Sequence, residues 1–84
     1  MKLGQATKLV KQLNSHMKYK DYVFSADKKK SIGQWVVEVH EIEKDYHNKI
    51  NLTHHKIIEA FSVIFDCRVM INVDIDRNPY YYFY

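Results

Sequence analysis

This chain of 84 residues has little of what interrupts or cross-links a fold: one cysteine, one proline and two glycines. A single cysteine excludes an intramolecular disulfide and is typical of a reducing compartment, so we expect a cytoplasmic protein. The scarcity of proline and glycine argues against disorder and long linkers. No stretch approaches the roughly 20 apolar residues of a membrane span, and no signal peptide is recognisable. We therefore expect no membrane partner.

The length is that of one domain, so residues 1–84 are expected to share one core. Hydrophobic residues make up 46% of the chain, which is enough to fold. A core of this size supplies only roughly 3–5 kcal/mol of stability unless a partner helps, so a homodimer is an open alternative.

Two segments carry apolar residues at helical spacing. The first predicts a helix from residue 3 to about residues 14–17, and the second a helix from about residue 52 to residue 66. The stripes consist of Leu3, Ala6, Val10, Leu13 and Met17 in the first segment and Ile57, Phe61, Ile64 and Phe65 in the second.

Three segments are typical of strands, because they are rich in β-branched and aromatic residues or alternate between apolar and polar. They span residues 19–26, 34–42 and 69–76. The polar residues 27–30 separate the first two, which predicts a hairpin with these residues at its tip.

Residues 79–84 form an aromatic C-terminal segment with five consecutive rings after the turn signal Asn78-Pro79. Neighbouring side chains of an extended segment point to opposite sides, so these rings cannot all face one core. The segment is either a short edge strand packed within the monomer or an interface for a second copy or another protein.

The predicted order is α-β-β-α-β, with a final β as the open alternative. Each element has one apolar side, so the economical arrangement is an α+β fold. We expect a single-layer sheet of three or four strands, covered on one face by two helices.

Charge is unevenly distributed, with a net +6 over residues 1–30 and −3 over residues 31–84. This asymmetry favours a basic surface that binds an anionic partner. We expect one contact surface at Lys18, Lys20, Tyr22, Lys28, Lys29 and Lys30, and a second at Tyr81, Tyr82, Phe83 and Tyr84. Lysines and rings together can bind single-stranded nucleic acid; the alternative is that the rings are core and the lysines keep an edge strand soluble.

No signature of catalysis is recognisable. Asp74 and Asp76 share a strand face with Asn72, and Glu38 or His40 could join them around a divalent ion, but alternating polar residues are typical of any solvated face. The five histidines lack zinc-site spacing, Cys67 has no local histidine motif, and no glycine-rich phosphate loop is present. We expect no enzyme, no cofactor and no metal.

A helix, a hairpin and a second helix in under a hundred residues resemble in outline several small inhibitor proteins of viruses and mobile elements, including some anti-CRISPR proteins. The outline covers most of the chain and includes no sequence motif. Inhibitors that mimic DNA are strongly acidic, whereas this chain is basic, which argues against DNA mimicry.

The chain carries its positive charge mainly in residues 1–30, is rich in aromatic residues and has no recognisable catalytic motif. Together these features predict a small regulatory or inhibitory binding protein. It would dock onto a larger protein or nucleoprotein; the alternative is a single-stranded nucleic-acid-binding protein that uses the lysine and tyrosine surface.

Overall fold

The computed structural model describes residues 1–19, 24–41 and 52–84. They form an α+β fold of two helices and a four-stranded antiparallel sheet, as predicted, and the chain ends in a fourth strand. The elements are α1 (Leu3–Tyr19), β1 (Phe24–Ser31), β2 (Gln34–Glu41), α2 (Leu52–Ile64), β3 (Val69–Val73) and β4 (Pro79–Phe83). Neither helix of the described part is long and apolar enough to cross a membrane.

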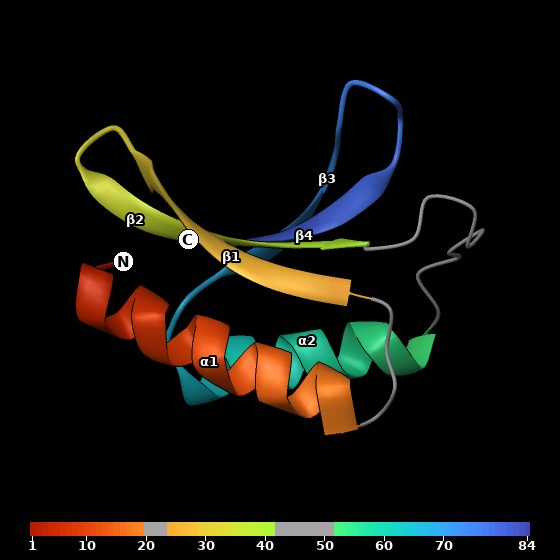
Figure 1. Ribbon diagram of the computed structural model, residues 1–84, viewed down its shortest axis with the longest axis horizontal. Coiled ribbons are helices and arrows are strands. Elements are labelled where there is room, and N and C mark those ends of the chain that lie inside the picture. Colours follow the sequence, from red (N-terminus) through yellow and green to blue (C-terminus); the bar gives the residue numbers. More distant parts are fainter. Residues whose placement is uncertain (20–23, 42–51) are drawn as a thin grey trace.

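Both helices cover the same face of the sheet (Figure 1). Helix α1 buries residues spaced three and four apart, and α2 contributes Ile58 to the same core. Removing this apolar area from water is the main force that holds the two layers together. The buried core consists of Ala6, Leu9, Leu13, Met17, Phe24, Ala26, Val37, Val39, Ile58, Tyr81 and Phe83.

The strand order is β1-β2-β4-β3, so β4 lies inside the sheet between β2 and β3. Of the two alternatives predicted for residues 79–84, the edge strand is therefore wrong, whereas the interface stays a prediction. The reason is pairing on both sides: Phe83 lies opposite Val37 of β2 and opposite Val69 of β3. An aromatic strand buried on one face suits this central position better than an exposed edge.

The first hairpin is displaced from its predicted position. Residues 27–30, expected at the tip, pair along β2, and the turn is closed by Ile32 and Gly33, both with positive φ (34° and 80°). This backbone matches the twist of a two-residue hairpin turn. Cross-strand pairing thus outweighs the weak strand propensity of aspartate and lysine. Of the strand predicted at 19–26, residue 19 belongs to α1 and residues 20–23 lie outside the described part.

The second hairpin turns earlier than residue 76. Asp74 Oδ1 accepts hydrogen bonds from the backbone N–H of Asp76 (2.9 Å) and of Asn78 (2.8 Å), and Arg77 has a φ of 63°. An aspartate that accepts amides of the following residues is a common turn device. This local bonding ends β3 at Val73.

Candidate functional site: the uncovered face of the sheet

Neither described helix lies over the other face of the sheet, and both hairpins bend away from the helices, so that this face is concave (Figure 1). Side chains alternate along each strand, so the residues between the buried ones point to this side. We call it the uncovered face. Its residues that matter here are Lys29, Val36, Glu38, His40, Arg68, Met70, Tyr80, Tyr82 and Tyr84.

Aromatic rings run along β4 on the uncovered face. Tyr80 stacks on His40 of β2, with ring centroids 4.3 Å apart and an interplanar angle of 17°. The ring centroids of Tyr82 and Tyr84 are 5.9 Å apart. Tyr80 and Tyr82 are half-buried, whereas Tyr84 is exposed. These contacts restrict the rings before any partner binds.

Beside the rings lies an ionic cluster around Glu38. Its Oε1 is 3.1 Å from Lys29 Nζ and 2.7 Å from His40 Nε2, and the Glu38 side chain is only 12% exposed. Burial by itself would raise the pKa of Glu38, but the hydrogen bonds from His40 and Lys29 outweigh it and lower the pKa below 4.5. The Glu38 carboxylate therefore stays ionised, and the side chains of Lys29 and His40 balance its negative charge.

This lowered pKa predicts a pH-dependent contribution to stability. Because the folded pKa lies below the unfolded one, the contribution is present above the unfolded value of 4.5 and is lost as the pH falls through the folded pKa. We expect Glu38→Gln to lower the free energy of unfolding by about 1 kcal/mol at pH 7, and the difference to shrink below pH 4.5. Urea denaturation of both proteins between pH 7 and pH 3 measures it. A difference that stays constant over this range would contradict the prediction, and Lys29→Ala should reduce the pH dependence without abolishing it.

The structure separates the predicted tyrosine surface into two parts. Tyr81 and Phe83 are 2% and 0% exposed and belong to the core, so their prediction as surface contacts is corrected. Successive side chains of a strand point to opposite faces. Tyr82 and Tyr84 lie on the uncovered face, so Tyr81 and Phe83 point toward the helices.

The predicted lysine surface is divided in the same way. Lys29 is exposed on the uncovered face, whereas Lys28 and Lys30 alternate with it and point to the other side of the sheet. Lys18 lies in α1, but its side chain, together with Lys20 and Tyr22, lies outside the described residues. No single patch of described residues unites the three lysines of β1.

Three residues of the uncovered face were not predicted as contacts: Tyr80, His40 and Glu38. The spacing Tyr80, Tyr82, Tyr84 was a usable signal, because alternate residues of a strand share a face. The contact between Tyr80 and His40 could not be predicted from the sequence, since it depends on β4 lying next to β2.

The other candidate chemistry is dispersed. No three metal-binding side chains meet among residues 1–19, 24–41 and 52–84. Strand β4 separates Glu38 from Asn72, and Asp74 is engaged in the turn. Cys67 is half-buried, and burial, with Asp66 nearby, raises the pKa of its thiol, which disfavours the reactive thiolate.

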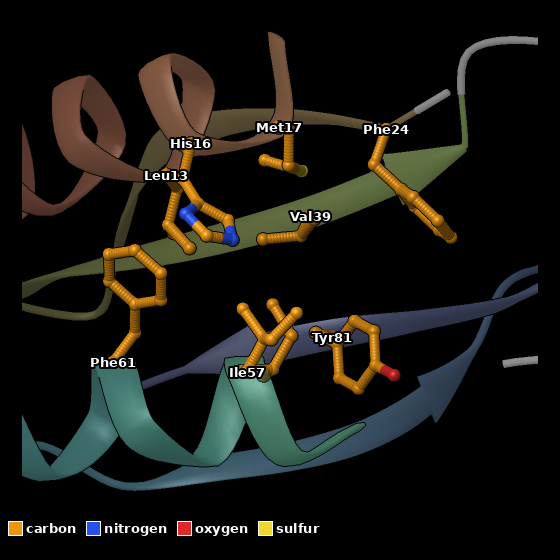
Figure 2. A pocket seen from close by; sticks show the side chains of 9 residues that line it. Leu13, His16, Met17, Phe24, Val39, Ile57, Phe61 and Tyr81 are labelled. Carbon is orange, nitrogen blue, oxygen red and sulfur yellow. The ribbon is translucent and has the colours of Figure 1, made fainter. Parts of the chain in front are cut away.

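A small cavity lies between the two helices and the sheet (Figure 2). Its volume of about 20 Å³ is close to that of one water probe, so it has no room for an organic ligand. Tyr81 lines it, and burial raises the pKa of its hydroxyl to about 12, so the hydroxyl stays protonated. The lining consists of Leu13, His16, Met17, Phe24, Val39, Ile57, Ile58, Phe61 and Tyr81. We interpret it as a packing defect of the core.

The chain was compared with models of protein families, with curated proteins and with solved structures. None of these comparisons found a match.

Proposed function

We propose that this protein is a small non-enzymatic binding protein that docks onto a larger protein through the uncovered face, in a regulatory or inhibitory role. The observation that carries the proposal is the row of tyrosine rings along β4, held by contacts with His40 and with one another. Tyrosine is among the residues that contribute most to protein interfaces, because its ring fills a pocket while its hydroxyl finds a polar partner.

Preorganisation supports this function. Ordering a flexible side chain at an interface costs roughly 0.5–1.5 kcal/mol, and rings that are already restricted avoid much of that cost. Tyr80 and Tyr82 are half-buried in the free protein, with Tyr80 stacked on His40. The concave shape of the uncovered face suits a convex element of the partner, such as a helix (Figure 1).

The charges of the uncovered face favour a protein over a nucleic acid. Lys29 is paired with Glu38, and Asp27 lies on the same side, opposite Glu38. Arg68 adds one positive charge at the far strand. Affinity for nucleic acid comes largely from positive charges that neutralise phosphates. A nearly neutral face with aromatic residues is instead typical of a protein interface.

Site-specific photo-crosslinking tests the proposal. A photoreactive phenylalanine derivative is placed at residue 82, and a control is placed at Lys11, which is exposed on α1. In producing cells we expect a discrete adduct with one larger protein from position 82 and none from position 11. The same partner, once purified, should bind Tyr82→Ala at least about 30-fold more weakly and Lys11→Ala with unchanged affinity. Adducts of equal yield from both positions, or none from position 82, would refute docking through this face.

Single-stranded nucleic acid is the second candidate, since rings on an open sheet can stack on bases. Titration of labelled single-stranded and duplex oligonucleotides at low and near-physiological salt separates the two functions. If the protein-docking proposal holds, oligonucleotide binding should be lost at near-physiological salt. Micromolar or tighter binding that survives this salt and falls in Tyr82→Ala would replace protein docking with nucleic-acid binding.

A further inference from the structure

We propose that the outer edge of β3 is a dimerisation site, at which β3 pairs antiparallel with β3 of a second copy of this chain. The two sheets would then continue into one another. The proposal rests on the backbone and side chains of β3 and is independent of the docking function of the uncovered face.

Three residues of β3 direct their backbone groups away from the sheet. Arg68 and Tyr84 exchange both backbone hydrogen bonds at 2.9 Å, which sets the alternation along the ladder. Residues of an antiparallel strand alternate between bonding one neighbour and bonding the other. The N–H and C=O groups of Val69, Ile71 and Val73 therefore point outward. Among the described residues no strand pairs with this side.

The opposite edge of the same sheet is protected, which makes the contrast informative. On β1, the Asn14 side chain bonds both backbone groups of Ala26, with Nδ2 to O at 3.0 Å and N to Oδ1 at 2.8 Å. Charged residues at 27–30 continue that edge. Charges and covered backbone groups are the usual means of preventing edge pairing. Strand β3, with the sequence VMINV, has neither a charge nor such a cover among the described residues.

The strand is self-complementary about Ile71. With Ile71 opposite Ile71 of the second copy, Val69 lies opposite Val73, and every outward backbone group of β3 finds a partner. If the two-fold centre lay at Met70 instead, Val73 would have no facing residue within β3 of the second copy. With the centre at Asn72, the same would hold for Val69. Just beyond the paired strands, the register centred on Ile71 brings Arg68 of one copy near the turn residue Asp74 of the other. Opposite charges thus meet at both ends of the pair.

The side chains also favour burial. On the helix side of β3, Ile71 is 43% exposed and Val73 60%, and on the uncovered face Met70 is 43% exposed. Exposed apolar side chains on both faces of an unpaired edge strand are the conditions under which strands associate. Pairing with a second copy would bring Ile71 against Ile71 and Val73 against Val69.

The oligomeric state over a range of concentrations tests this proposal. Sedimentation equilibrium of the full chain is expected to show a monomer–dimer equilibrium. Ile71→Lys would place two like charges directly opposite each other and should weaken the dimer at least about tenfold. Met70→Lys is the matched control, because Met70 is equally exposed but lies opposite Asn72, so its effect should stay within about threefold. Circular dichroism confirms that both variants fold. A wild-type chain that remains monomeric up to millimolar concentration, or equal effects of the two lysines, would overturn the proposal.

Disulfide trapping tests the register in a Cys67→Ala background. Ile71→Cys would bring two cysteines to facing positions with Cα atoms about 5.5 Å apart, within disulfide range. Met70→Cys faces Asn72 instead and should not cross-link. A covalent dimer with cysteine at 71 and not at 70 supports the assigned register, whereas the reverse result would refute it.

Tyr82→Ala should leave the dimer unchanged, so failure of dimerisation and failure of protein docking are distinguishable.

Discussion

Replacing Phe83 with alanine is expected to lower the free energy of unfolding by about 3–5 kcal/mol. Phe83 is fully buried and packs where β2, β4 and β3 meet, opposite Val37 and Val69. Its removal forfeits the transfer of the ring from water and leaves a cavity that the two neighbouring strands cannot collapse into without breaking their register. Thermal and urea unfolding followed by circular dichroism measure the loss.

A graded series keeps this prediction testable, since small domains have total stabilities on the order of 5–15 kcal/mol and the alanine variant could be largely unfolded. Phe83→Leu is expected to cost about 1.5 kcal/mol, because much of the volume is retained. The control is Tyr84→Ala, one residue along and 38% exposed on the opposite face, which should cost less than about 1 kcal/mol. If Tyr84→Ala were as damaging as Phe83→Ala, the assignment of core and surface along this segment would be incorrect.

Replacing Asn14 with alanine is expected to cost about 2–3 kcal/mol. Its side-chain amide satisfies both the N–H and the C=O of Ala26, a buried residue on the outer edge of β1. Losing the amide removes the partner of both backbone groups of Ala26, and leaving a buried group without a partner costs about 1–3 kcal/mol. Urea unfolding measures the loss, together with hydrogen exchange at the Ala26 amide, which should become faster.

Thr7→Ala is the matched control in the same helix. The Thr7 hydroxyl donates to the carbonyl of Leu3 within α1 and is exposed, so its loss should change stability by less than about 0.5 kcal/mol. Because Asn14 also covers the β1 edge, Asn14→Ala should make that edge more prone to strand pairing, which a rise in concentration-dependent association would reveal. An unchanged stability in Asn14→Ala would contradict the prediction.

The two helices, the strand content and the single covered face could be predicted from the sequence, because each depends on the local spacing of apolar residues. The stripe in α1 was visible as a spacing of three and four, and the buried residues Ala6, Leu13 and Met17 belong to it. The final strand was recognised as an alternative through its rings and the preceding turn signal. The limits of β1 were missed, because a lysine-rich segment forms a strand only when β2 provides a partner for it.

The candidate site was only partly predictable. Sequence indicated that the tyrosines of the C-terminal segment could not all be buried, but it did not say which ones were. Which tyrosines are buried follows from the pairing register of β4 with β2, in which Phe83 lies opposite Val37 and Tyr81 opposite Val39. A shift of one residue would have reversed it. The lysines of β1 are divided between two faces, which the sequence did not indicate, because charge along a sequence does not reveal on which face of a strand each side chain lies.

By itself, the sequence determined the fold class: its periodicities decide which segments are helices and strands and require one apolar face to be covered. It also determined that the edge segment VMINV has no charge to discourage pairing. Only the tertiary structure decided that β4 lies between β2 and β3 and that His40 stacks on Tyr80. It also decided that Asn14 protects one edge of the sheet, while no described strand pairs with the other. The physical reason is that these features depend on strand order and register, which result from contacts between residues far apart in the chain.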